Sequence, residues 1–231
     1  MTTNDAATDG QAISWREQAV ARSLDSARVR AESRVQRFLD AALELMADSD
    51  SGKDFTVQEV VERSGQSLRS FYQYFGGKQE LLLALFEESV RSAAELLRER
   101  VAQEQDPLDR LHRFVVEYYW VCRPAGKGKG RADKRRPSRA LAEFAQHLLT
   151  SQPGEASRAF VPIVSLFEEI LDAAVEAGDL RPEVRRKRVA GVVLEAIMFN
   201  MFSTTIGGPD DGPAGDPAEE LWDLILHGIA A

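Results

Sequence analysis

Residues 56–81, TVQEVVERSGQSLRSFYQYFGGKQEL, decide how the N-terminal part of the chain folds. Two short amphipathic stretches, 56–63 and 67–75, flank a turn that contains Gly65. Each stretch begins at a hydroxyl residue that can cap a helix, and glycine is the residue that most often ends one. The pattern therefore predicts a short helix, a tight turn and a second short helix.

Helix is predicted for most of the remaining chain as well. From Val35 to Met46, apolar residues recur at helical spacing, which predicts an amphipathic helix directly upstream. Further helices are predicted downstream over 78–103, 107–122, 137–149, 155–177, 182–206 and 218–229. No two alternating segments are joined by a hairpin turn, so the predicted fold class is all-α.

The composition is that of an ordinary soluble globular protein. Of the 231 residues, 44% are apolar and 29% are charged, and the net charge is −8. No apolar run reaches the length of about 18 residues that could span a membrane, and the N-terminus lacks the pattern of a secretory signal. We therefore expect a cytoplasmic protein with no membrane partner.

The sequence contains no motif that indicates catalysis or metal binding. Its one cysteine, Cys122, cannot form an internal disulfide, and three histidines leave few ligands for a metal. Zinc-protease, nucleophile-elbow and phosphate-loop motifs are all missing. We expect no enzyme activity, no catalytic residue, no metal and no cofactor, and we interpret Cys122 as a packed thiol.

One segment departs from the acidic character of the chain. Residues 123–139 contain eight basic side chains and a single acidic one, Asp133. The part over 123–136 is predicted to be a loop. A solvated loop is one interpretation, and contact with DNA or with a phosphate-bearing ligand such as a CoA thioester is the other.

Residues 60–81 resemble the DNA-binding signature of the TetR family of transcriptional regulators. The matching features are Gly65, Ser67, Phe71-Tyr72, Tyr74-Phe75, Gly76-Gly77 and Lys78-Gln79-Glu80-Leu81. The resemblance implies a three-helix, helix-turn-helix DNA-binding domain over 34–80. A long helix would join it to a larger helical ligand-binding and dimerisation domain over 81–231, and residues 1–33 would form a basic, flexible arm.

The resemblance also implies which residues contact DNA. The predicted contacts are Thr56, Gln58, Gln66, Ser67, Leu68, Arg69, Ser70, Tyr72, Gln73, Tyr74 and Lys78. Among them, Thr56, Gln58, Tyr72, Tyr74 and Lys78 match positions that contact the DNA backbone. Arg69 could bind guanine in bidentate fashion, and a helix that begins at Lys78 favours a phosphate there without any reference to a family.

Other interpretations of these residues stay open. Leu68 shares helical spacing with Phe71 and Phe75, so it could pack in the core as readily as it could contact DNA, and the two tyrosines could be structural. Six arginines precede or enter the first helix, and they suit either a solvated arm or entry into the minor groove: Arg16, Arg22, Arg28, Arg30, Arg34 and Arg37. Since residues 1–80 carry a net charge of −3, DNA binding would depend on a few placed contacts.

The C-terminal part is rich in large apolar side chains. Ordinary core packing accounts for all of them, but some could line an apolar ligand pocket, and the candidates are Phe114, Tyr118, Phe144, His147, Phe167 and Phe199. His147 is interpreted as a core or pocket-wall residue, because no second metal ligand stands at helical spacing from it. By resemblance, the helices over 155–177 and 182–206 would form the interface of a homodimer.

Taken together, the sequence predicts a sequence-specific DNA-binding transcriptional regulator. It would act as a repressor on a double-stranded DNA operator and be released by a small, largely apolar effector. The alternative is a helical protein-interaction module that does not bind DNA.

Overall fold

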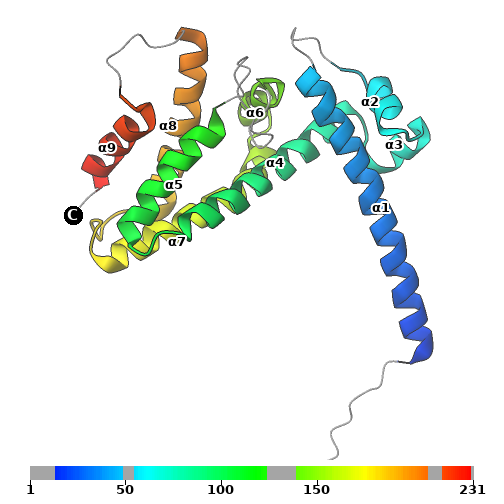
Figure 1. Ribbon diagram of the computed structural model, residues 1–231, viewed down its shortest axis with the longest axis horizontal. Coiled ribbons are helices and arrows are strands. Elements are labelled where there is room, and N and C mark those ends of the chain that lie inside the picture. The colour runs from blue at the N-terminus through cyan, green and yellow to red at the C-terminus, as the bar shows by residue number, and fades with distance from the viewer. Residues whose placement is uncertain (1–13, 49–54, 124–138, 208–214, 230–231) are drawn as a thin grey trace, which may run out of the picture.

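The computed structural model describes residues 14–48, 55–123, 139–207 and 215–229, and within these residues it contains nine helices and no strand (Figure 1). The all-α prediction is therefore confirmed. The helices are α1 (Trp15–Asp48), α2 (Val57–Ser64), α3 (Leu68–Tyr74), α4 (Lys78–Val101), α5 (Pro107–Cys122), α6 (Arg139–Ser151), α7 (Pro153–Ala177), α8 (Arg186–Gly207) and α9 (Pro217–Ile229). The expected structure of 1–13 and of most of the basic loop 123–136 lies outside the described residues.

The first helix is longer than the sequence pattern predicted. It begins at Trp15 instead of near residue 34, so residues 15–33 are helical and not a coil arm. The stretch contains neither glycine nor proline and is rich in alanine and arginine, which favour helix. The N-terminal half of α1 projects past the other helices, with Val20 and Leu24 exposed (Figure 1).

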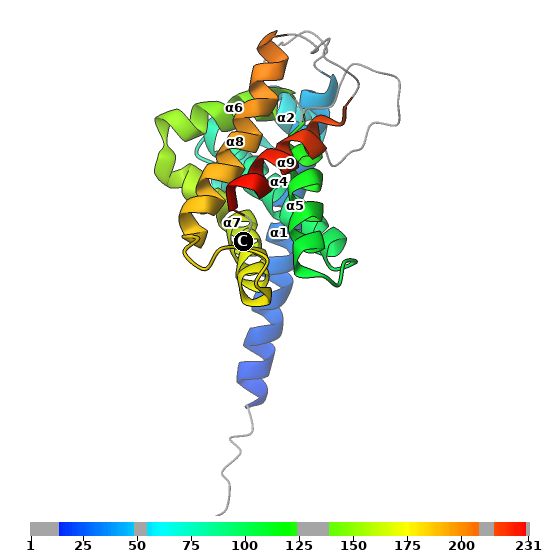
Figure 2. The same cartoon turned by 90° about the vertical axis from the view of Figure 1, so that its left-hand side faces the viewer.

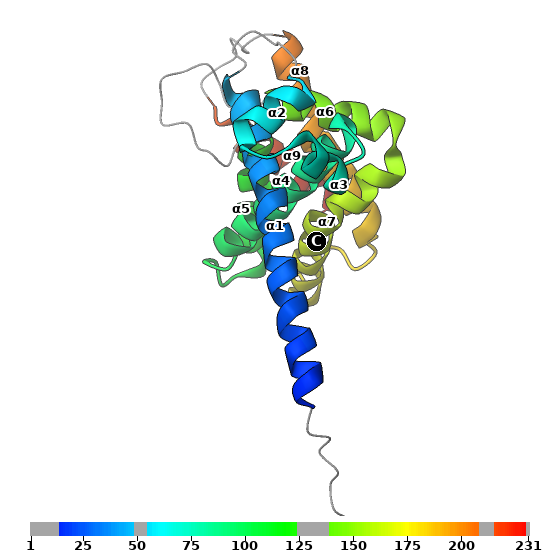
Figure 3. The same cartoon turned by 90° about the vertical axis from the view of Figure 1, so that its right-hand side faces the viewer.

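Helices α1, α2 and α3 pack around a cluster of phenylalanines. The ring of Phe38 on α1 stands edge-on to Phe71 on α3, with ring centroids 5.4 Å apart, and edge-on to Phe75 at 6.1 Å. All three side chains are buried. Burial of one such side chain contributes about 1.5–3 kcal/mol, which is how a helix as short as α3 is held in place. Figure 3 shows the side of the molecule that carries α1, α2 and α3.

Helix α4 is the long element that connects the two parts of the fold. At its start Leu81 and Leu85 are buried, and α4 packs against α1. Further along, Phe86, Val90 and Leu97 are buried, and α4 packs against α5, α6 and α7. A movement of α4 within the C-terminal helices would therefore displace α2 and α3.

The C-terminal helices form a second core. Phe114 on α5 stacks on Phe167 on α7, with centroids 4.5 Å apart and planes 13° from parallel. Helix α9 packs on the outside of α5, where His112 meets Glu219 at 2.7 Å (Figure 2). None of the described helices combines the length and the apolar composition that crossing a bilayer requires.

Candidate nucleic-acid interface

Capping side chains fix the ends of α2 and α3. The hydroxyl of Thr56 accepts a hydrogen bond from the Glu59 amide at 3.2 Å, and the Thr56 amide donates to the Glu59 carboxylate at 2.7 Å. Ser67 caps α3 by accepting from the Ser70 amide at 3.1 Å. These bonds satisfy amides that the helices leave unpaired, and they confirm the capping predicted at Thr56 and Ser67.

Gly65 sets the angle between the two helices. Its φ of 65° lies in the left-handed region, which residues with a Cβ rarely adopt. The Gly65 amide donates to the Glu62 carbonyl, and the Gln66 amide donates to the Val61 carbonyl, each at 3.3 Å. This pair of bonds is the Schellman pattern, so the turn that follows α2 is specified by one glycine.

Four side chains share the exposed face of α3. Leu68 is 43% exposed and Tyr72 is 57% exposed, and Arg69 and Gln73 are exposed as well. Their positions are i, i+1, i+4 and i+5, which place them on one side of a helix. An aliphatic group, a guanidinium group, a phenol hydroxyl and an amide are thus presented together. The exposure of Leu68 removes core packing as its role in this chain.

The opposite face of α3 points into the core, and this corrects one expectation. Phe71 is buried as expected, and Tyr74 is half-buried and packs against the core. The Ser70 hydroxyl oxygen is also buried, so it cannot meet DNA in this conformation. Ser70 was expected to face outward, but its angular position on the helix lies between the exposed Gln73 and the half-buried Tyr74.

Lys78 stands at the first position of α4, as the sequence predicted. Its Nζ donates to the carbonyl oxygen of Phe55 at 2.7 Å and lies 4.4 Å from the centroid of the Phe55 ring. The residue is half-buried. The lysine therefore connects the start of α4 to the start of α2.

The remaining predicted contacts lie at the beginning of α2 and in the turn. Thr56 and Gln58 are exposed, but both side chains have intramolecular partners: the Thr56 hydroxyl donates to Glu59, and the Gln58 amide donates to Glu62, each at 2.9 Å. Ser67 is exposed and Gln66 is half-buried. Thr56, Gln58, Gln66 and Ser67 thus belong to the same helix-turn-helix unit as the exposed face of α3.

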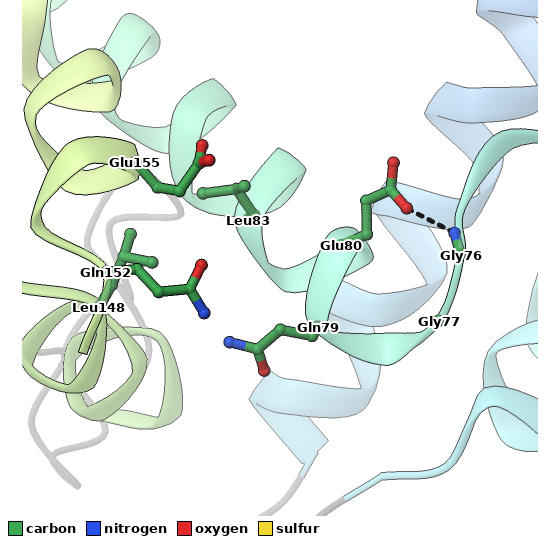
Figure 4. Close-up of a pocket in the computed structure, with 8 residues that line it drawn as sticks. All are labelled: Gly76, Gly77, Gln79, Glu80, Leu83, Leu148, Gln152 and Glu155. Atoms are coloured by element: carbon green, nitrogen blue, oxygen red, sulfur yellow. Dashed lines mark hydrogen bonds between the residues drawn. The ribbon is translucent and has the colours of Figure 1, made fainter.

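An open cleft separates the start of α4 from the junction of α6 and α7. It has a volume of about 390 Å³, and its walls include Glu80 and Leu83 on one side and Gln152 and Glu155 on the other (Figure 4). Glu80 accepts a hydrogen bond from the Gly76 amide at 2.5 Å, which fixes the turn between α3 and α4. Space is therefore present beside the element that joins the two parts of the fold.

A second cavity, of about 80 Å³, lies among α4, α5, α6, α7 and α8. Of the six residues predicted as pocket candidates, Tyr118 lines it. Phe114 and Phe167 are buried in the stack between α5 and α7, and Phe144 packs edge-on against Phe86. His147 is exposed on α6 and Phe199 is half-exposed on α8, so neither is a wall of this cavity.

The cavity wall includes residues that were not among the six predicted pocket candidates. Phe86 and Ser89 contribute from α4 and Phe160 from α7. Helical spacing identifies buried positions, but it does not distinguish a side chain that faces another from one that faces a void. Only the long apolar periodicity of α4 and α7 pointed to these elements.

Tyr118 and Cys122 form a hydrogen-bonded pair at this cavity. Burial raises the pKa of the Cys122 thiol to about 12, and it raises the pKa of the Tyr118 phenol well above its ordinary value. Burial disfavours the charged form of each group, so both are neutral at physiological pH. Cys122 is a protonated, packed thiol in this structure.

Two short capped helices at a glycine turn, with polar side chains on the outer face of the second, define a helix-turn-helix protein. Residues 38–85 match the family model described as bacterial regulatory proteins, tetR family. The chain thus carries the DNA-binding domain of the TetR family, and the resemblance seen in the sequence is confirmed.

Solved structures share the fold over most of the chain. FadR of Bacillus subtilis, solved in complex with stearoyl-CoA, is 16% identical, with a TM-score of 0.61 over 84% of this chain and 98% of that one. The fatty acid degradation regulator FadR of Bacillus halodurans is 18% identical, with a TM-score of 0.58 over 84% and 95%. Reduced Escherichia coli NemR is 15% identical, with a TM-score of 0.59 over 86% and 98%. No curated protein sequence matches the chain.

Proposed function

We propose that this protein is a transcriptional repressor that binds a double-stranded DNA operator in a sequence-specific manner. The observation that carries the proposal is the exposed face of α3, formed by Leu68, Arg69, Tyr72 and Gln73. In a major groove, Arg69 would bind guanine, Gln73 would bind adenine and Leu68 would contact a thymine methyl group. Tyr72 would bind a backbone phosphate.

The proposed active species is a homodimer. One α3 covers one half-site, and two copies related by two-fold symmetry cover half-sites about 34 Å apart. Exposed apolar side chains on α7 and α8, namely Val161, Val192 and Phe199, support an interface through these helices. This proposal assigns Phe199 to the partner contact and not to a ligand pocket.

The repressor is proposed to release DNA when a small, largely apolar effector binds in the C-terminal helices. The cavity beside α4 supports this, because α4 packs against both parts of the fold. The long acyl chain of the stearoyl-CoA in complex with the similar Bacillus subtilis FadR is a further support for an effector with a large apolar part. An effector that prefers the non-binding arrangement about 100-fold would supply roughly 2.7 kcal/mol of coupling.

A gel-shift experiment tests the proposal. The full chain is titrated against the intergenic DNA upstream of its own gene, with an unrelated duplex of equal length as competitor. We expect a complex that survives the competitor, that is lost with Arg69→Ala combined with Gln73→Ala, and that is unchanged with Lys187→Ala on α8. A chain that forms no sequence-dependent complex at moderate salt would be a helical interaction module instead.

A further inference from the structure

The described residues that form the wall of the cavity beside α4 include no charged side chain. Its apolar part comes from all five surrounding helices and includes Phe86, Phe160 and Met198. Its polar part consists of Ser89 on α4 and of Tyr118 and Cys122 on α5. No aspartate, glutamate, lysine, arginine or histidine of the described chain lines it.

The three polar groups differ in what they can offer to a ligand. Tyr118 and Cys122 are one turn apart on α5 and hydrogen-bond to each other. Ser89 faces them from α4, and among the described residues its hydroxyl has no hydrogen-bond partner. One donor and acceptor group is therefore available in an otherwise apolar space.

This wall selects against charged ligands. A carboxylate that entered the cavity would lose its hydration and would meet no cation among the described residues of the wall, and this loss of free energy is far larger than the gain from one hydrogen bond. An uncharged hydroxyl or carbonyl group loses less hydration and can bond to Ser89. The buried thiol and phenol add no charge, because burial keeps both protonated.

We propose that this cavity binds a neutral, predominantly apolar molecule whose one uncharged polar group hydrogen-bonds to the Ser89 hydroxyl. The effect of such a ligand on DNA binding rests on the proposed function. Ser89 belongs to α4, so the bond would attach the ligand to the helix that carries α2 and α3. It narrows the effector class to neutral molecules and excludes free carboxylic acids in their ionised form.

Matched small probes test the proposal on the full chain without DNA. Benzyl alcohol, benzoate and toluene share one aromatic ring and differ in the group attached to it. Their binding is measured by calorimetric titration and by the rise of the unfolding midpoint that a bound ligand produces. We expect benzyl alcohol to bind at least tenfold more tightly than benzoate.

Two serine variants on α4 separate the hydrogen bond from general effects. Ser89→Ala should weaken the binding of benzyl alcohol by roughly three- to tenfold, which corresponds to the loss of one neutral hydrogen bond. The affinity for toluene should stay unchanged. Ser92→Ala, at an exposed position of the same helix, should change neither probe. Ala142→Phe, which fills the cavity, should abolish the binding of both.

The proposal is overturned if benzoate binds as tightly as benzyl alcohol, or if Ser89→Ala leaves the preference for benzyl alcohol over toluene intact. Binding that persists in a folded Ala142→Phe variant would place the probes elsewhere and would also overturn it. Because these titrations contain no DNA, their result is independent of the gel shift. A failure of DNA binding would overturn the proposed function and leave the ligand class of the cavity standing.

Discussion

The Nζ atom of Lys78 lies 2.7 Å from the carbonyl oxygen of Phe55, and 4.4 Å from the centroid of its ring. The two residues belong to different elements: Lys78 begins α4, and Phe55 directly precedes the cap of α2. One side chain therefore fixes the position of α2 against α4 and places a positive charge near the starts of both helices. A structural role and the proposed phosphate contact therefore fall on the same side chain.

Replacing Lys78 with alanine should weaken binding to every DNA sequence. Loss of one phosphate contact would reduce the slope of log affinity against log salt by about one unit. Affinities measured between low and moderate salt check this. Urea unfolding of the same variant separates the two roles, and an unchanged slope in a less stable protein would leave Lys78 with the structural role alone.

Arg69→Ala should act differently, because a bidentate contact to guanine reads sequence. We expect the preference at one base pair of each half-site to relax, with a loss of about 1–3 kcal/mol of discrimination. Affinities for a set of single-base operator variants give the measurement. Arg63→Ala is the matched control, since Arg63 pairs with Glu44 at 3.2 Å. Uniform weakening across the set would assign Arg69 to the DNA backbone.

Gly65→Ala should destabilise the protein by about 1 kcal/mol, because an alanine at φ 65° is strained even where space is open. Denaturant unfolding at neutral pH measures the loss. Gly154→Ala is the control: nothing lies within 4 Å of the added methyl group and its φ is not positive, so no loss is expected. Equal effects in the two variants would show that the turn does not depend on the left-handed conformation.

The helix-turn-helix unit was predictable because its signals are local. Caps at Thr56 and Ser67 and the turn glycine Gly65 act within four residues of themselves, and the structure has all three where the sequence placed them. The outward position of Leu68 was not determined by spacing alone, because residues at 68, 71 and 75 suit one stripe. The edge contacts of Phe38 with Phe71 and Phe75 decide which side faces inward.

The cavity could not be predicted to the same degree. Tyr118 was among the candidates, but Ser89 was not, because one serine in an amphipathic helix resembles any other until five helices are packed around it. His147 shows the opposite case, a predicted pocket residue that lies in solvent. The next residue, Leu148, is buried, but successive side chains of a helix point in different directions, so the imidazole of His147 is exposed. The start of α1 was predicted too late because the prediction followed the apolar residues that pack in the core. Residues 20–31 continue the same helical spacing, but their large apolar side chains are exposed.

Cys122 should resist alkylation in the folded protein. With a pKa raised to about 12 from an ordinary value of 9.0, its thiolate fraction at pH 8 falls by roughly a thousandfold relative to an unfolded thiol. Iodoacetamide labelling with and without urea measures the ratio. Because the unfolded thiol ionises first, this group should also make stability fall as the pH rises above 9. Rapid labelling of the folded chain at pH 8 would contradict both statements.

Helix α1 presents three exposed arginines, Arg30, Arg34 and Arg37, at i, i+4 and i+7 on one side of the helix, close in sequence to Phe38, which contacts Phe71 on α3. If this side follows the DNA backbone beyond the half-site, replacing all three with alanine should lower the salt slope by up to about three units. The footprint should shorten at its outer ends, while the preference among single-base variants stays unchanged, because phosphates carry no sequence information. Arg28→Ala is the control, as Arg28 pairs with Glu32 on another side of the helix. A triple variant with an unaltered slope and footprint would show that this side of α1 is solvated and that α2, α3 and the start of α4 hold the DNA by themselves.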